Sequence, residues 1–157
     1  LLKNLNSNTA VIYRNYEKNL VISELLAIKR YCKSKNLKLY LSNNFKLSIK
    51  LDLDGAYIPS FNKSTKHLNY KLWRNFTILG SAHNLREIRL KETQKVNQIF
   101  ISSLFKKNKN YLGLYKFIKL EKLTNTATIA LGGINKKNIR RLVFTKSVGF
   151  AGISYFN

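Results

Sequence analysis

The stretch that decides the fold is Ala127-Thr128-Ile129-Ala130-Leu131-Gly132-Gly133-Ile134-Asn135, a short run of strand-forming residues that ends in a double glycine. Residues 149–153 form a second such run, with small residues at its flanks. Between the two, residues 136–144 carry apolar side chains at a spacing that suits a helix packed on a sheet. Strand, glycine loop, helix and strand make up the βαβ unit of a parallel sheet.

The glycine pair Gly132-Gly133 also suggests a ligand. In a (β/α)8 barrel the loops after the last two strands often bind phosphate, because glycines let backbone N–H groups approach an anion. The simpler interpretation of the pair is a tight turn without any ligand. A phosphorylated small molecule is therefore the first ligand to consider at this loop.

The rest of the chain repeats the same alternation, at the spacing of about 20 to 25 residues that is typical of βα units. The predicted strands span residues 10–14, 37–41, 55–58, 76–80, 98–101, 128–131 and 149–153. The predicted helices span residues 20–34, 45–50, 65–73, 85–93, 114–123 and 136–144. This pattern predicts an α/β protein of the (β/α)8 TIM-barrel class, with residues 1–157 as a single domain. Because a closed barrel has eight strands, we expect the first strand and the last helix to be lacking and residues upstream of Leu1 to be missing.

Composition narrows the class of protein. A chain of 157 residues with 45% apolar residues can bury one core. It contains no run of about 18 apolar residues and does not begin like a signal peptide, so we expect a soluble, cytoplasmic protein. The single cysteine, Cys32, excludes an internal disulfide and predicts a buried structural thiol.

The formal net charge of +22 raises the question of an anionic partner. The lysines are spread along the whole chain, and no helix-turn-helix, zinc-finger or RNA-binding signature appears. We therefore expect neither a specific nucleic-acid partner nor a membrane partner, although the scarcity of acids keeps a preference for anions open. The oligomeric state stays open.

Polar residues follow the predicted strands, at the ends that would meet at the mouth of a barrel. They are cations, amides, hydroxyls and one imidazole, without a carboxylate: Arg14, Asn43, Asn44, Ser60, Asn62, Ser81, His83, Ser102, Ser103, Lys106, Lys107, Lys109 and Ser154. With few acids and no cysteine pair, neither a zinc site nor a carboxylate-bound magnesium site is predicted. Such a mouth is suited to an anion.

Two of these residues are the main candidates for chemistry. Arg14 can bind phosphate through two parallel hydrogen bonds, although a surface arginine that ends a strand is an equal alternative. His83, close to Ser81, can move protons near neutral pH without a metal, or can simply be a neighbour of the next helix N-cap. His67 lies in a polar stretch and is predicted to be solvated.

Seven segments between Ala10 and Ser154 follow the order and spacing of a known family. They are Val11-Ile12-Tyr13-Arg14, Asp54-Gly55-Ala56-Tyr57-Ile58-Pro59, Ser81-Ala82-His83, Ile101-Ser102-Ser103-Leu104-Phe105, Leu112-Gly113-Leu114-Tyr115-Lys116-Phe117, Ala130-Leu131-Gly132-Gly133-Ile134 and Gly149-Phe150-Ala151-Gly152-Ile153. By these segments the chain resembles the thiamine phosphate synthase and TenI (thiazole tautomerase) superfamily, especially its compact alphaproteobacterial members. The resemblance implies a (β/α)8 barrel and a role in thiamin biosynthesis.

The resemblance also implies site residues. Gly132, Gly133, Ile153 and Ser154 match positions that bind a thiazole phosphate. Arg14, Asn43 and Ser81 match positions that contact the pyrophosphate of the pyrimidine substrate in the synthases. His83 matches the histidine thought to act as acid and base in TenI-type enzymes, where it shifts a proton within a thiazole carboxylate phosphate.

Departures from the family pattern separate its two branches. The two aspartates that hold Mg2+ in the synthases appear here as Asn44 and Asn62, and neutral amides bind a hard dication weakly. Tyr16 and the pair Lys106-Lys107 replace further family residues. We therefore expect TenI-like proton transfer by His83, without a cofactor. Thiamine phosphate synthase activity with Mg2+ is the alternative, and a non-catalytic phosphate-metabolite or nucleic-acid binder is the third interpretation.

Overall fold

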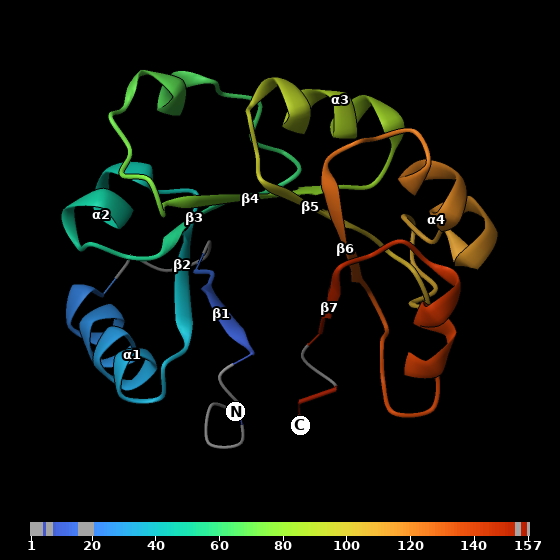
Figure 1. The fold of residues 1–157 in the computed structure, drawn as a ribbon, viewed down its shortest axis with the longest axis horizontal. Helices are drawn as coiled ribbons and strands as arrows, with labels where there is room; N and C mark the ends of the chain where they lie inside the picture. The colour runs from blue at the N-terminus through green and yellow to red at the C-terminus, as the bar shows by residue number, and fades with distance from the viewer. Residues whose placement is uncertain (1–4, 6–7, 16–20, 153–154, 157) are drawn as a thin grey trace.

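A computed structural model of the chain describes residues 5, 8–15, 21–152 and 155–156. Seven parallel strands form one sheet in the order of the chain: β1(Ala10–Tyr13), β2(Lys38–Ser42), β3(Gly55–Ile58), β4(Thr77–Ala82), β5(Gln98–Ile101), β6(Ala127–Leu131) and β7(Gly149–Ala151). The sheet curls into an open arch with the helices on its outer side (Figure 1). This is an α/β fold of the TIM-barrel kind, as the sequence predicts.

The strands begin and end close to their predicted limits. β3 and β5 coincide with the predicted ranges, and the other strands that the structure describes in full differ by one or two residues. The predicted strand at residues 149–153 ends at Ala151, and Ile153 lies outside the described residues. Within the described residues β1 pairs with β2 alone and β7 with β6 alone. The predicted absence of an eighth strand stays a prediction.

The outer layer consists of the helices α1(Ile22–Ser34), α2(Phe45–Lys50), α3(Leu85–Thr93) and α4(Gly113–Glu121), with the 3-10 turns η1(Lys66–Asn69) and η2(Ile139–Phe144). Two predicted helices are therefore wrong in length. Before residues 136–144 the Asn135 side chain accepts hydrogen bonds from the N–H groups of Lys137 and Asn138, as an N-cap does. Val143 and Phe144 stay exposed, however, so burial of an apolar face does not extend this turn into a regular helix. In residues 65–73 Leu68 and Trp73 stay exposed, so no apolar face drives a longer helix.

Alternation along the strands separates two cores. Tyr40, Tyr57, Leu79 and Phe100 point to the concave side, where the rings of Tyr57 and Phe100 meet edge to face at 5.7 Å. The outward side chains, including Ala56, pack against the helices. Because side chains alternate along a strand, the residue two positions after each inward side chain also faces inward, at the carboxyl end of the strand. Ser42 and Ser81 hold such positions.

No helix in the described part of the chain is long and apolar enough to cross a membrane.

The single cysteine, Cys32, is buried on α1. Its burial, with a smaller effect of Asp54, raises the pKa of the thiol. A thiol that stays protonated is a poor nucleophile, which agrees with the structural role predicted for Cys32.

Candidate functional site

The predicted site residues that the structure describes lie along one rim of the sheet, where parallel strands end together. The register pairs Ala82 with Ile101 and Ile101 with Ala130, so His83, Ser102 and Leu131 are neighbours at the ends of β4, β5 and β6. Neighbouring strands are about 4.8 Å apart, so the β4 and β6 ends are separated by roughly 10 Å. A small phosphorylated molecule can span that distance.

His83 has a defined orientation at this rim. Its Nδ1 atom lies 2.9 Å from the main-chain oxygen of Ser102 and 3.0 Å from the Ser102 hydroxyl oxygen. A carbonyl oxygen can only accept a hydrogen bond, so Nδ1 carries the proton in the neutral ring. The Nε2 atom is then left as a proton acceptor. His83 is half-buried, as a residue that meets a ligand at a mouth would be.

The start of α3 fixes the backbone at His83, where the chain leaves β4. Asn84 caps α3 by accepting a hydrogen bond from the Glu87 N–H at 2.9 Å. The Glu87 carboxylate accepts a hydrogen bond from the Asn84 side-chain nitrogen at 3.0 Å and another from the His83 N–H at 2.8 Å. The arrangement is reciprocal, as in a capping box. Both oxygens of this carboxylate are therefore engaged in holding the rim.

The glycine loop after β6 has a conformation that side chains rarely adopt. Gly132 and Gly133 have φ angles of 107° and 75°. A Cβ on Gly132 would lie 2.5 Å from the Ser103 hydroxyl oxygen, and one on Gly133 would lie 2.5 Å from the Lys106 backbone nitrogen. The Gly132 carbonyl accepts the N–H groups of Phe105 and Lys106, so the loop after β5 packs tightly on this turn.

The glycine loop also offers a donor to a ligand. Gly133 is exposed, and its N–H donates to no acceptor among the described residues. Its carbonyl accepts the Asn138 side chain at 2.8 Å, which orients the peptide. Lys106, Lys107 and Lys109 lie exposed on the adjoining loop. The predicted phosphate ligands Ile153 and Ser154 lie outside the described residues.

The structure places the remaining predicted residues at the same rim. Arg14 follows β1 directly and is exposed, while Ser81 is buried on the concave side of β4. Asn43 follows β2 with a left-handed φ of 61°, a conformation that asparagine tolerates better than most residues. The rim therefore combines a guanidinium, a hydroxyl, an amide and an imidazole, as predicted.

A hollow of about 240 Å³, the amide pocket, lies beside the rim and is lined by Asn43, Asn44, Phe45, Lys46, Asn62, Ser64, Lys66, His67 and Tyr70. The Asn44 side chain caps α2 by accepting the Leu47 N–H at 3.1 Å. The Asn62 side chain donates to the Asn43 side-chain oxygen at 2.5 Å and accepts the Ser64 N–H at 2.7 Å. None of the lining residues carries a carboxylate, and all three amides already make hydrogen bonds within the protein. This donor set does not fit Mg2+.

His67 is the clearest error among the predictions. It is buried, its ring stacks on Phe45 with the ring centres 4.4 Å apart, and its Nε2 atom lies 2.8 Å from the Gln94 main-chain oxygen. Stacking and a hydrogen bond to the end of α3 compensate for its burial. Lys91 and Gln94, both fully buried behind this pocket, were not predicted to have any role. The signal in the sequence was a lysine and a glutamine, Lys91 and Gln94, three and six positions after Ile88, where inward-facing apolar residues would be expected.

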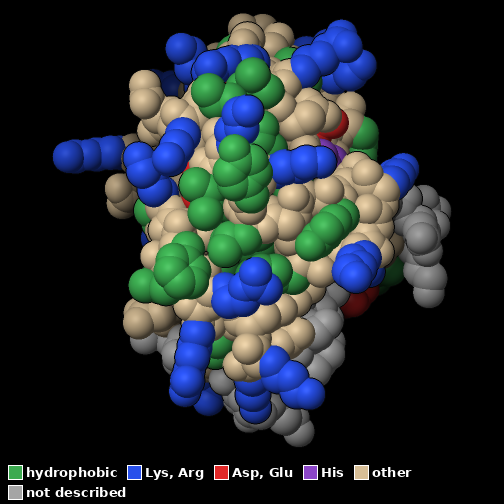
Figure 2. All heavy atoms as spheres, turned by 90° about the vertical axis from the view of Figure 1, so that its right-hand side faces the viewer, with side chains coloured by type: hydrophobic (Ala, Val, Ile, Leu, Met, Phe, Trp, Pro, Cys, Tyr) green, Lys and Arg blue, Asp and Glu red, His purple; other side chains and the backbone are tan. Residues whose placement is uncertain are grey.

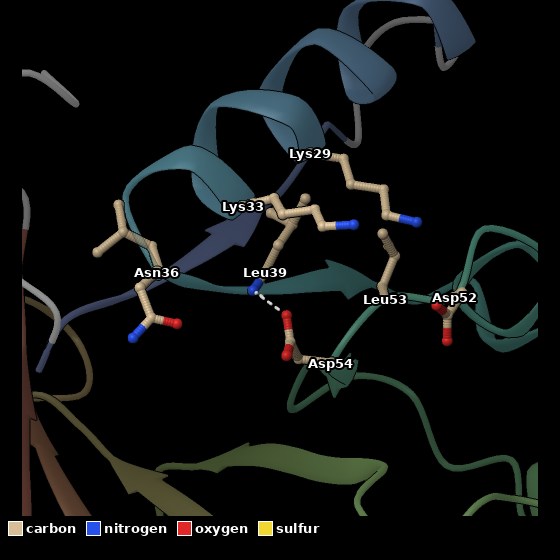
Figure 3. A pocket seen from close by; sticks show the side chains of 8 residues that line it. Lys29, Lys33, Asn36, Leu39, Asp52, Leu53 and Asp54 are labelled. Carbon is tan, nitrogen blue, oxygen red and sulfur yellow. Dashed lines mark hydrogen bonds between the residues drawn. The ribbon is translucent and has the colours of Figure 1, made fainter.

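A second hollow, of about 230 Å³, lies at the opposite end of the sheet, where β2 and β3 begin. Figure 3 shows Lys29 and Lys33 of α1 above it and Asp52 and Asp54 below. Asp54 accepts the Leu39 N–H at 2.8 Å, and Lys29 donates to the Leu51 carbonyl at 2.6 Å. These contacts join α1 and β2 to the segment between α2 and β3, so Asp54 and Lys29 stabilise the fold.

On the face that carries α4 and η2 the basic residues are scattered. Figure 2 shows Lys and Arg side chains spread among apolar ones on the face that carries α4 and η2. The carboxylate of Glu121, at the end of α4, is buried and accepts hydrogen bonds from Thr128 and Ser147. A dedicated nucleic-acid groove would concentrate the cations in one stripe. This face shows no such concentration.

Comparisons with known proteins agree with the resemblance noted in the sequence. The family model described as thiamine monophosphate synthase matches residues 3–156. A thiamine-phosphate synthase of Prochlorococcus marinus is 30% identical over 156 residues, which cover 95% of this chain and 44% of that protein. A thiamine-phosphate synthase of a Hydrogenobaculum species is 26% identical over 152 residues, which cover 93% of this chain and 71% of that protein.

A solved structure shares the fold. The thiamine phosphate pyrophosphorylase from Pyrococcus furiosus superposes with a TM-score of 0.75 at 23% identity, and the match covers 93% of this chain and 73% of that one. At this identity the likeness shows the fold alone. The chain spans less than half the length of the Prochlorococcus relative.

Proposed function

Because this chain belongs to the thiamine monophosphate synthase family, we propose that it acts in thiamin biosynthesis on a phosphorylated thiazole, with proton transfer by His83 as its reaction. The observation that carries this proposal is the Nε2 atom of His83, left free to accept a proton at a rim whose described residues offer no free carboxylate. An imidazole that can accept and return a proton, together with an anion site, is sufficient for a proton shift.

The proposed binding mode starts from the phosphate. The Gly133 N–H and the Arg14 guanidinium provide donors for its oxygens, and Gly132 lets the backbone approach them. Ile153 and Ser154 complete this part of the site in the proposal. Asn43 and Ser81 bind the remainder of the substrate.

The proposed reaction moves one proton and needs no other reactant. His83 Nε2 takes a proton from one atom of the thiazole carboxylate phosphate and becomes an imidazolium, whose Nδ1–H stays on the Ser102 carbonyl. The same Nε2–H then returns the proton to a different atom of the ligand. Substrate and product are tautomers, so charge and atoms balance.

The amide pocket supports a reaction without a divalent metal. Asn44 and Asn62 stand where the resemblance expects metal-binding aspartates, and their side chains cap α2 and bridge to Asn43. A departing pyrophosphate would need charge compensation from another source. We therefore propose no cofactor for this chain.

Synthase activity is the second candidate, favoured by the names of the relatives, each of which is called a thiamine-phosphate synthase. In this alternative the surplus of lysines replaces part of the metal charge. Formation of thiamin phosphate from the two phosphorylated halves in the presence of Mg2+ would support it. No product at saturating metal would exclude it.

The third interpretation, a non-catalytic binder of phosphate metabolites or nucleic acid, depends on the net charge of +22. Its affinity for a nucleic acid should fall steeply with salt. Failure to bind a duplex or a single strand at low salt would exclude the nucleic-acid form.

The binding part of the main proposal can be tested without turnover. A titration of the 15N-labelled chain with a thiazole phosphate should shift the amide signals of Gly132 and Gly133 and the ring signals of His83. Inorganic phosphate should reproduce the glycine shifts but not the full His83 shifts, because it lacks the heterocycle. Shifts confined to surface lysines would contradict the site.

A further inference from the structure

Lys91 is a fully buried cation that forms no ion pair with any residue the structure describes. Its side chain is 0% exposed, and the salt bridge present on α3 joins Arg89 and Glu92 instead. The Lys91 ammonium has three N–H donors, and three neutral oxygens accept them: Pro59 O at 2.9 Å, Asn62 O at 3.0 Å and Gln94 Oε1 at 2.9 Å. Moving an ammonium out of water costs free energy, so the burial of Lys91 indicates that its hydrogen bonds have a role in the protein.

The sheet provides space for this lysine. A Cβ on Gly80 of β4 would lie 2.9 Å from Lys91 Cδ and 3.3 Å from Lys91 Cγ. The aliphatic stem of Lys91 therefore passes across β4 at the place where the strand has no side chain. In this way a residue of α3 reaches the loop that follows β3, on the other side of β4.

Gln94 fastens the same loop. Its side-chain nitrogen donates to Asn62 O at 3.0 Å and to Ser64 O at 2.9 Å. Its main-chain oxygen lies 2.8 Å from His67 Nε2 of η1, and the His67 ring stacks on Phe45, so Gln94 is also connected to α2. Lys91 and Gln94 thus donate hydrogen bonds to three main-chain carbonyls of the loop at residues 59–64, those of Pro59, Asn62 and Ser64.

The loop held in this way places the Asn62 side chain beside Asn43 at the rim. While the main-chain oxygen of Asn62 is held by Lys91 and Gln94, its side-chain nitrogen donates to Asn43 at 2.5 Å. Asn43 and Asn62 both line the amide pocket. Each hydrogen bond from Lys91 or Gln94 to the loop carbonyls therefore restricts where the two amides can lie.

We propose that Lys91 and Gln94 are positioning residues, which hold the loop at residues 59–64 so that Asn62 stays on Asn43 and the amide pocket keeps its shape for a polar part of the substrate. The position of the loop stands on the contacts above. The identity of the substrate rests on the proposed function.

Hydrogen exchange on the full chain tests the positioning directly. In Lys91→Met, which keeps the stem and removes the ammonium, amide protection in residues 60–64 and at Asn43 should fall about tenfold or more, while β4 and α4 stay protected. Lys119→Met, an exposed lysine on α4, is the matched control and should change neither. Unchanged loop protection in Lys91→Met would overturn the proposal, as would a uniform loss across the chain in both Lys91→Met and the milder variant below.

Gln94→Glu provides that milder variant. It keeps an oxygen for Lys91 and places a carboxylate beside the ammonium, but it removes the two donors to the loop. The loop should lose protection while the global stability is retained. Intact loop protection in this variant would remove Gln94 from the proposal.

Kinetics separate positioning from a merely structural role. Lys91→Met should raise KM severalfold and leave kcat within about twofold, because His83 is held by Ser102 and Glu87 rather than by the loop. A severalfold fall in kcat with an unchanged KM would contradict the positioning of the pocket by Lys91. If the chain has no tautomerase activity, the proposed function fails, whereas the hydrogen-exchange result still decides the role of Lys91 and Gln94.

Discussion

The Nδ1 atom of His83 lies 2.9 Å from the main-chain oxygen of Ser102, and this contact decides which nitrogen of the ring is free to react. A main-chain carbonyl cannot be removed by a side-chain substitution, so the orientation is built into the ends of β4 and β5. The register that pairs Ala82 with Ile101 brings the two residues together. The chemistry proposed for the rim depends on this relationship.

The tautomer of His83 is the first prediction. In the neutral ring, 15N NMR should show the proton on Nδ1 and an unprotonated Nε2. Ser102→Ala removes the hydroxyl at 3.0 Å but keeps the carbonyl, so the same tautomer should persist. A predominant Nε2–H form in the wild-type chain would contradict the assignment.

The second prediction concerns the glycine loop. Gly133→Ala places a Cβ 2.5 Å from the Lys106 backbone in a residue with a φ of 75°, so it should destabilise the fold by about 1 to 3 kcal/mol. Affinity for inorganic phosphate should also fall. Gly149→Ala, where a Cβ meets nothing within 4 Å, is the matched control in thermal unfolding and calorimetric titration. Equal phosphate affinity in both variants would rule out the loop as the anion site.

The third prediction concerns the metal. Calorimetry of the wild-type chain with Mg2+ should show no specific binding at the amide pocket, and a chelator should not alter affinity for a thiazole phosphate. The double variant Asn44→Asp, Asn62→Asp places two carboxylates there and should gain measurable Mn2+ binding. Specific Mg2+ binding by the wild-type pocket would instead favour the synthase alternative.

The fourth prediction concerns Lys91 and pH. Burial lowers the pKa of Lys91 to about 8, an effect that Glu87 partly opposes. Above that pH the folded chain has released a proton that the unfolded chain still binds, so the free energy of unfolding contributed by Lys91 rises with pH. The rise between about pH 7 and pH 9.5 should be about 2 kcal/mol.

Denaturant unfolding across this pH range measures the effect, with Lys91→Met as the comparison. Burial raises the pKa of Cys32, which acts in the opposite direction, so the difference between the two proteins isolates the lysine. Parallel pH profiles for the wild-type and Lys91→Met chains would contradict the burial of a charged ammonium.

The strands of this fold were predictable from the sequence because local features mark them. β3 ends before Pro59 and β6 ends at the glycine pair, so the boundaries of these strands are chemical breaks in the chain. The rim residues follow from the strand ends. The helices predicted at residues 65–73 and 136–144 were too long because periodicity does not show that Leu68, Trp73 and Val143 stay exposed in the folded chain.

The support behind the rim could not be predicted in the same way. A lysine on an amphipathic helix normally points to solvent, and the space that Gly80 leaves for Lys91 exists only once α3 packs on β4. Gln94 and His67 meet across 27 residues of sequence. Pairings of this kind are set by tertiary packing, whereas the location of His83 at the rim follows from its place after a strand.

Turnover by His83 tests the central claim most directly. The thiazole carboxylate phosphate tautomer is incubated with the wild-type chain and with His83→Ala in the absence of metal, and conversion is followed by 1H NMR. We expect conversion by the wild-type chain, a loss of about 10² to 10⁴ in kcat for His83→Ala, and affinity for inorganic phosphate unchanged within about twofold. No conversion by the wild-type chain, or conversion by His83→Ala at the wild-type rate, would contradict the account.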